Sequence, residues 1–137
     1  MAVTLRSIKN MLRSRIIGQE ELVDAVSTTV FKYLMRILGG KLGYFKSSAA
    51  VNLLILGSTG TGKTHTCKTL ADEIGLPFVE INAKSICQEG WSGKSLIKQV
   101  VEGLRAYPSS KTPSEFHPII LIDEFDKICM PLSSSSN

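Results

Sequence analysis

Apolar residues recur every three or four positions near the start of the chain, which is the spacing of one face of an α-helix. One helix is predicted over residues 5–17 and a second over residues 19–38. A glycine pair at 39–40 predicts the end of the second helix, because glycine commonly follows a helix C-terminus. The apolar positions of the first helix are Leu5, Ile8 and Leu12.

The rest of the chain alternates short apolar runs with helical patterns. Residues 51–56 form a nearly continuous apolar run, which is typical of a strand buried on both faces. Strands alternating with helices indicate crossover units and a parallel sheet, and therefore the α/β class. The remaining predicted elements are a loop at 57–62, a helix at 63–74, a strand at 77–82, a helix at 94–107, a loop at 106–118 and a strand at 119–122.

The loop between the first strand and its helix matches a phosphate-binding pattern in full. Residues 57–64 read Gly-Ser-Thr-Gly-Thr-Gly-Lys-Thr, as in Gly-x4-Gly-Lys-Ser/Thr. Such a loop curls around phosphate oxygens with successive N–H groups pointing inward, and side chains at its glycines would obstruct the curl or the phosphate. The helix start adds free N–H groups and a positive dipole end. Lys63 is expected to reach the β- and γ-phosphates, and Thr64 to place its hydroxyl on Mg²⁺.

The alternative for this loop is a glycine-rich turn with no ligand. The predicted strand before it and the helix after it favour phosphate binding, because the motif requires that context.

Two acids follow the last predicted strand. Asp123 and Glu124 would lie at the C-terminal edge of the sheet, where open parallel sheets bind ligands. Asp123 is predicted to hold Mg²⁺, directly or through water. Glu124 is predicted to polarise the water that attacks the γ-phosphate, as a general base does. Asp126 is expected to cap the helix that follows.

Composition adds limited information. The net charge is +4, and its basic excess lies at the start, before the first acid at Glu20. A basic start can be a mitochondrial transit peptide, but the apolar stripe favours an amphipathic lead-in helix. The three cysteines have an odd count and wide spacing, which favours free thiols over a disulfide framework or zinc site. A cytoplasmic location is therefore predicted, with the mitochondrial matrix as the alternative. No apolar run has the length of a membrane helix.

Taken in order, these motifs resemble those of the AAA+ ATPases, and within them the ClpX-type protein unfoldases. Residues 16–19, Ile-Ile-Gly-Gln, resemble the adenine-side motif, and residues 90–93, Gly-Trp-Ser-Gly, resemble the pore loop. Residues 121–128 are very similar to the carboxylate motif and its continuation. The related HslU type has a large insertion between pore loop and carboxylates, where this chain has a short loop, so the ClpX type fits better.

The resemblance implies a phosphate-loop NTPase fold, a three-layer sandwich around a parallel sheet, with ATP and Mg²⁺ as cofactors. It implies Lys63 and Glu124 as catalytic residues, with Thr64 and Asp123 on Mg²⁺. The implied nucleotide-binding residues are Ile17, Gly18, Gly57, Ser58, Thr59, Gly60, Thr61, Gly62, Lys63, Thr64 and His65.

The same resemblance implies partners. Such enzymes form hexameric rings, bind ATP between subunits and pull an unfolded polypeptide through the pore, in some cases into a peptidase. The pore-loop residues carried over are Gly90, Trp91, Ser92 and Gly93, where the family usually has Tyr-Val in place of Trp-Ser. Trp91 packed in a core is the alternative. A membrane partner is not expected, and nucleic acid is disfavoured because no basic stripe is interleaved with aromatics.

The chain departs from the family in what it does not contain. No four-cysteine zinc domain precedes the motifs, and the sensor residues and arginine finger would lie beyond residue 137. Only strands 1, 2 and 3 of the family order 5-1-4-3-2 are expected, which leaves a gap at the centre of the sheet. The chain is therefore interpreted as part of a longer ATPase that alone is weak or inactive. The predicted domains are a lead-in at 1–40, a partial ATPase core at 41–130 and a Ser-rich tail at 131–137.

Three other functions remain open. A nucleotide-binding module without turnover is favoured by the missing arginine finger, which contributes about 10³–10⁵ in rate. An AAA+ nucleic-acid motor or loader is the second. A small-molecule kinase is the third, although the motifs at 16–19 and 90–93 are not expected there.

Overall fold

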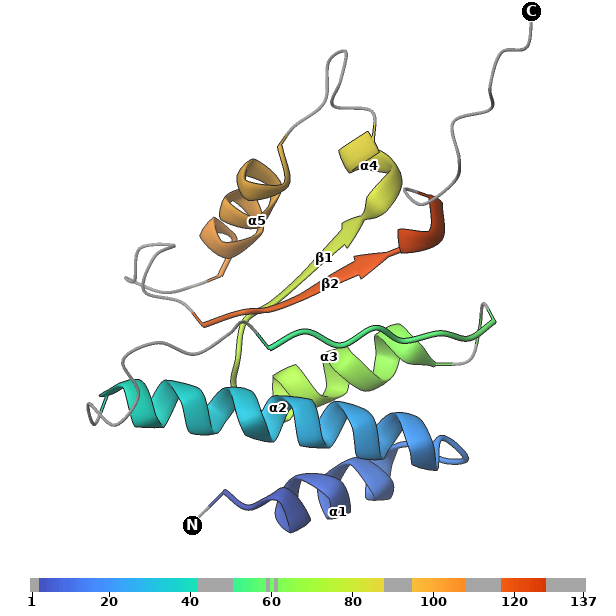
Figure 1. Cartoon of the computed structure of the whole chain (residues 1–137), viewed down its shortest axis with the longest axis vertical. Coiled ribbons are helices and arrows are strands. Elements are labelled where there is room, and N and C mark those ends of the chain that lie inside the picture. Colours follow the sequence, from blue (N-terminus) through green and yellow to red (C-terminus); the bar gives the residue numbers. More distant parts are fainter. Residues whose placement is uncertain are drawn as a thin grey trace, which may run out of the picture. The chain divides into compact units, whose positions relative to one another are not determined.

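The computed structural model describes residues 3–41, 51–58, 60, 62–87, 95–107 and 117–127. The chain forms two compact units, Met1–Glu73 and Ile74–Asn137, and each is described by itself. Within the described residues the elements are helices and two strands (Figure 1). This arrangement confirms the predicted α/β class.

The first unit begins with two packed helices, α1 (Leu5–Arg15) and α2 (Glu20–Lys41). Thr4 starts α1 through a capping box, because its hydroxyl accepts from the Ser7 N–H at 3.1 Å while the Ser7 hydroxyl accepts from the Thr4 N–H at 3.0 Å. The predicted lead-in helix is confirmed. Its apolar stripe is covered, together with apolar residues of α2. These buried residues are Ile8, Leu12, Val23, Val26 and Val30.

Two basic residues of α1 are paired with acids of α2. Lys9 lies 3.2 Å from Asp24, and Arg13 lies 3.0 Å from Glu20 and 3.1 Å from Asp24. Part of the basic excess at the start of the chain therefore forms the polar border of a helix pair. Exposed pairs of this kind stabilise a fold by about 0.2–1 kcal/mol each.

The predicted end of α2 is wrong. The helix continues through Gly39 and Gly40 to Lys41, three residues past the expected end at Leu38. Glycine lowers helix stability by only about 1 kcal/mol relative to alanine and keeps its backbone donor and acceptor. The i to i−4 hydrogen bonds can therefore continue across it.

The predicted strand at 51–56 is also wrong. Residues 51–58 are irregular, and Leu53, Leu54 and Leu56 are 40%, 66% and 85% exposed. A strand needs a hydrogen-bonded neighbour, and among the described residues the sheet has two strands, neither of them here.

Helix α3 (Lys63–Ile74) completes the first unit with the bounds that the sequence predicts. Its inner face is buried and is made of Thr66, Cys67, Leu70 and Ala71. Burial raises the pKa of the Cys67 thiol to about 11. The helix is therefore anchored along its length, which holds its N-terminal turn in place beside the glycine-rich loop.

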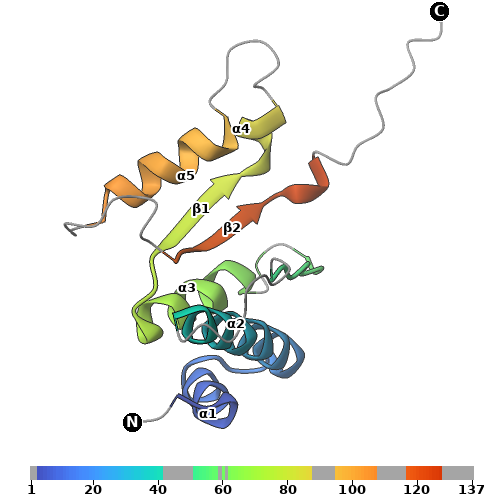
Figure 2. The same cartoon turned by 60° about the vertical axis from the view of Figure 1, so that its left-hand side comes forward.

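The second unit is built on two parallel strands, β1 (Phe78–Asn82) and β2 (Ile119–Asp123). Their register places Phe78 beside Ile119 and Asn82 beside Asp123, so both strands end at one edge (Figure 2). The prediction that these two strands are neighbours in a parallel sheet is confirmed. Between them come α4 (Ala83–Cys87), which the sequence did not predict, and α5 (Leu96–Arg105), shorter than the expected 94–107.

Helix α5 packs on β1 and forms the core of this unit. The buried residues are Val79, Ile81 and Leu104, with Ile86, Leu96 and Val100 packed around them. Gly103 permits the contact, since a Cβ there would lie 2.9 Å from a methyl group of Val79. The Tyr107 hydroxyl accepts from the Phe78 N–H at 2.6 Å and donates to the Phe78 carbonyl at 2.9 Å. Searching the described residues finds no helix with the length and apolarity needed to span a membrane.

Candidate nucleotide-binding site

The glycine-rich loop has the backbone that a phosphate-binding loop needs. Gly60 and Gly62 have φ values of +81° and +80°, a left-handed conformation that favours glycine. A Cβ at either position would meet no atom within 4 Å, so backbone conformation and not crowding selects glycine here. Thr59 and Thr61, also predicted to bind nucleotide, lie outside the described residues.

Lys63 folds back over this loop. Its ammonium donates to the carbonyl oxygens of Gly57 at 2.8 Å and Ser58 at 2.7 Å. The cation therefore lies on the loop itself, where anionic oxygens would be held.

Helix α3 starts immediately after the loop and anchors it. Its first turn leaves backbone N–H groups without helical partners, and the dipole makes that end positive. The Thr66 hydroxyl and the Thr66 N–H both donate to the Gly62 carbonyl at 2.9 Å. Thr64 is half-buried in the same turn, and His65 is exposed. The loop and helix start thus have the backbone conformation and free N–H groups that anion sites use, and nucleotide binding by these residues stays a prediction.

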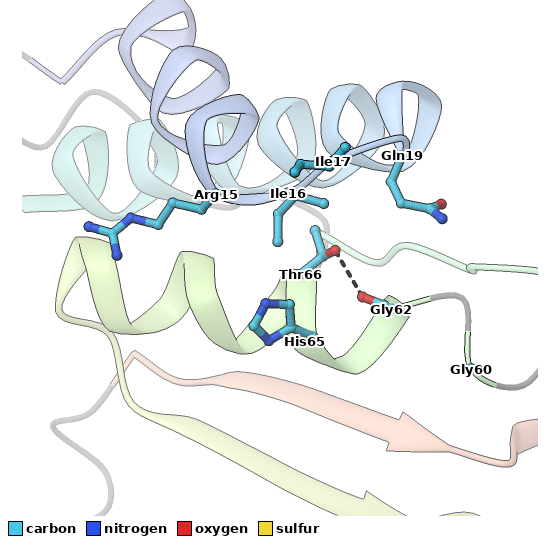
Figure 3. A pocket seen from close by; sticks show the side chains of 8 residues that line it. All are labelled: Arg15, Ile16, Ile17, Gln19, Gly60, Gly62, His65 and Thr66. Atoms are coloured by element: carbon cyan, nitrogen blue, oxygen red, sulfur yellow. Dashed lines mark hydrogen bonds between the residues drawn. The ribbon is translucent and has the colours of Figure 1, made fainter.

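A pocket of about 290 Å³ joins this loop to the linker between α1 and α2 (Figure 3). The volume is near the lower end of the range for ligand pockets. It brings together Ile17, Gly60, Gly62 and His65, which the sequence predicts to bind nucleotide. The full lining is Arg15, Ile16, Ile17, Gln19, Gly60, Gly62, His65 and Thr66.

The linker itself is a tight connection. Gly18 has φ of +74°, which turns the chain between the two helices, and Ile17 beside it is 93% exposed. Ile16 is buried and its N–H donates to the Leu12 carbonyl at 2.7 Å. A large exposed isoleucine at a pocket rim is an apolar surface that a flat ring could cover.

Some pocket residues were not predicted as site residues. Thr66 is four positions beyond Gly62, and that helical spacing is the signal that could have found it. Arg15, Ile16 and Gln19 flank or belong to the adenine-side motif, so their position in the chain was the available signal. Apart from position, these four residues have no sequence motif that indicates a binding role.

The two carboxylates lie in the second unit, at the edge of the sheet where both parallel strands end. Asp123 ends β2, and its Oδ1 accepts from the Glu124 N–H at 2.8 Å. Glu124 follows with φ of +54°, a conformation that costs a residue with a side chain about 1–2 kcal/mol. The strained turn directs the Glu124 side chain toward the end of β1.

Glu124 is held by two side chains that the sequence did not predict. Its Oε2 accepts from Asn82 Nδ2 at 3.1 Å and lies 3.2 Å from Lys84 Nζ. The Asn82 hydrogen bond, followed by that of Lys84, lowers the pKa of the Glu124 carboxyl. The Glu124 side chain is therefore held as a carboxylate. Asn82 could have been found because it ends the strand next to Asp123.

The helix that Asp126 is predicted to cap would follow Lys127, outside the described residues, so this role stays a prediction. Asp126 lies inside the short 3-10 helix η3 (Phe125–Lys127) and not before it, and its carboxylate is 3.4 Å from Lys127 Nζ. The pore-loop residues Gly90, Trp91, Ser92 and Gly93 lie outside the described residues, so their role stays a prediction.

A loop of this kind on the N-terminus of a helix, in an α/β chain with an apolar strand that ends in Asp-Glu, defines a phosphate-loop NTPase. Comparison with protein families agrees with this class. Residues 53–137 match the model of the ATPase family associated with various cellular activities (AAA). The chain belongs to that family.

Comparison with curated proteins shows which members of the family this chain resembles. The chain is 31% identical over 121 residues to the ATP-dependent Clp protease ATP-binding subunit ClpX of Bacteroides fragilis, covering 88% of the chain and 29% of that protein. It is 35% identical over 129 residues to ClpX 3 of Methylococcus capsulatus, with the same coverage. For ClpX of Treponema denticola the identity is 31% over 125 residues, covering 91% and 30%. The predicted resemblance to ClpX-type ATPases is confirmed, and the chain spans under a third of these relatives' length.

Proposed function

We propose that this chain binds ATP with Mg²⁺ as the nucleotide-binding part of a ClpX-like motor. The observation that carries the proposal is the pocket, where the Ile16–Gln19 linker meets the phosphate loop and α3. The linker side carries Ile16 and Ile17, which would contact a base, together with Arg15 and Gln19. The other side carries Gly60, Gly62 and the first turn of α3, whose backbone N–H groups would hold phosphates. A nucleoside triphosphate has the same division into a flat ring and an anionic chain.

Within this proposal each loop residue has a role. The loop N–H groups from Gly57 to Gly62 and the first turn of α3 hold the phosphates. Lys63 bridges the loop carbonyls and the β- and γ-phosphates. Ile17 lies on the base side and His65 lines the same pocket, while Gly18 turns the chain next to Ile17. Mg²⁺ prefers oxygen ligands, and the Thr64 hydroxyl and Asp123 carboxylate are the proposed ones.

Hydrolysis is proposed to depend on Glu124 as the base for the attacking water. Its lowered pKa keeps it ionised near neutral pH, as a base must be before it takes a proton, but also makes it a weaker base. The same contacts favour a second candidate, nucleotide binding without turnover, because Asn82 and Lys84 both engage its Oε2. A carboxylate oxygen held by two partners must be released or shared before it can orient water.

The motor output is proposed from the relatives. Their printed names describe ATP-binding subunits of an ATP-dependent Clp protease. For this chain we propose ring assembly, a peptidase partner and a polypeptide substrate gripped by Trp91. A cytoplasmic location belongs to the same proposal, and the bacterial relatives give the mitochondrial alternative no support.

The test is a titration of a fluorescent ATP analogue with Mg²⁺ against the chain and its Lys63→Ala variant. Removing the cation that lies on the loop should weaken binding at least about tenfold, as loss of a charge-assisted contact does. Lys68→Ala is the matched control, since Lys68 is an exposed lysine on the same helix outside the pocket lining. Equal affinities for the parent and Lys63→Ala would rule out phosphate binding at this loop.

A further inference from the structure

One ion pair connects the end of α1 to the last turn of α3, at the far end of α3 from the phosphate loop. Arg15, the last residue of α1, places its Nη2 2.7 Å from the Glu73 Oε1. Glu73 lies in the last turn of α3, ten residues after Lys63. At 1.5 Å per residue, that is about 15 Å along the helix. Glu73 therefore cannot touch phosphates held at the start of α3.

The pair differs from the other ion pairs of α1. Lys9 and Arg13 bind acids on α2. Helices α1 and α2 are already held together by buried apolar residues such as Ile8 and Leu12. Arg15 binds α3, and it directly precedes the linker that forms the base side of the pocket. In Figure 3 its guanidinium extends toward the end of α3 opposite the phosphate loop. Its geometry is that of a tether and not of a phosphate ligand.

The linker needs such a tether. Ile16 at its start is buried, but Gly18 is in a left-handed turn and Ile17 is almost fully exposed, so residues 17–19 bury little apolar surface of their own. An acid in the last turn of a helix is also disfavoured by the helix dipole, and an arginine beside it offsets that cost.

We infer that Arg15 and Glu73 are a positioning pair that holds residues 16–19 against α3, so that the base side of the pocket is formed before nucleotide binds. This inference rests on the proposed nucleotide site. The pair acts through the linker and not by touching the nucleotide. Breaking it should weaken a ligand that has a base and leave one that has only phosphates unchanged.

The experiment uses the full 137-residue chain and three variants: Arg15→Ala, Glu73→Ala and the charge swap of Arg15→Glu with Glu73→Arg. Binding of the fluorescent ATP analogue and of inorganic triphosphate is measured with Mg²⁺. Each single variant should bind the ATP analogue about two- to fivefold more weakly, the effect of an exposed ion pair. Triphosphate binding should not change, and the swap should restore ATP affinity. Lys9→Ala is the control, because it breaks an ion pair of α1 away from the pocket.

Amide hydrogen exchange without nucleotide gives an independent readout. Both single variants should speed exchange at residues 17–19, and the swap should reverse this. Unchanged exchange would overturn the inference, as would a swap that restores nothing. A loss of affinity in Arg15→Ala but not in Glu73→Ala would show Arg15 to be a direct ligand. If the parent chain bound no ATP while exchange still responded, the proposed function would fail and the tether would stand.

Discussion

Residues 51–56 and 119–123 are both apolar segments that lead directly into side chains with a proposed role on nucleotide. The second is strand β2, paired along its length with β1, and it delivers Asp123 to a sheet edge beside Asn82. The first leads into the phosphate loop but forms no ladder, and Leu56 remains 85% exposed. Both segments are mostly apolar, so composition does not distinguish them. They differ because, among the described residues, only 119–123 is paired with a neighbouring strand.

The comparison also separates the proposed phosphate binding from the proposed action of Glu124 as a base. The phosphate loop holds its form through local features, namely two left-handed glycines, the folded-back Lys63 and the start of α3. The carboxylate pair depends on a partner strand, because Asn82 and Lys84 reach Glu124 from the end of β1. A binding loop can form from nearby sequence, whereas a positioned base needs a second strand.

The largest expected effect sharpens this separation. In the proposed assembled and hydrolysing form of the protein, Glu124→Gln should lower ATP turnover at least about 100-fold, because an amide cannot act as a base. Affinity for the ATP analogue should stay near the parental value. Steady-state phosphate release and a binding titration measure the two. Asp126→Asn, a change at an acid two positions on, should leave both intact, and parental turnover in Glu124→Gln would exclude Glu124 as the base.

The next effect tests the pairing itself. Ile81 is 3% exposed in β1, so Ile81→Ala should lower the free energy of unfolding by about 2–5 kcal/mol. Leu56→Ala should change it by about 0.5 kcal/mol or less, as exposed positions do. Urea unfolding of the two variants gives both numbers. Similar losses would mean that residues 51–56 are buried in solution and that the contrast between the segments is wrong.

A smaller loss is expected where α5 covers β1. Gly103→Ala places a Cβ 2.9 Å from a methyl group of Val79, and Val79 has little freedom to move. Overpacking of this kind costs about 1–3 kcal/mol. Combining it with Val79→Ala should cost less than the sum of the two single changes, since the clash is removed. Thermal unfolding measures the cycle, with Lys98→Ala on the exposed side of α5 as control. Strict additivity would contradict the close contact.

The smallest effect concerns α3, on the side of the phosphate loop. Burial raises the pKa of Cys67 from 9.0 to about 11, so the folded chain holds the thiol proton more tightly than the unfolded chain. Its contribution to stability is complete below pH 9.0 and is lost as pH rises toward 11. Stability should therefore fall less steeply across this window in Cys67→Ala, in which the titration of Tyr33 remains. Parallel pH curves for the parent and the variant would contradict the burial of Cys67.

Local patterns predicted a large part of the molecule. Helix α3 has the bounds that its periodicity indicates, and β1 and β2 begin and end within one residue of their apolar runs. The phosphate loop was also predictable, since its glycines and lysine act through backbone conformation and a short reach. These features depend on residues close together in the chain, and this is why a sequence pattern identifies them.

Other features depend on residues far apart in the chain. The sequence determined which segments can be strands, but only the tertiary structure decided that β2 pairs with β1 while 51–56 stays unpaired. The tertiary structure likewise decided that Arg15 meets Glu73 and that Asn82 and Lys84 meet Glu124. A strand or an ion pair gains its stability from a partner, and the identity of that partner is a property of the folded chain.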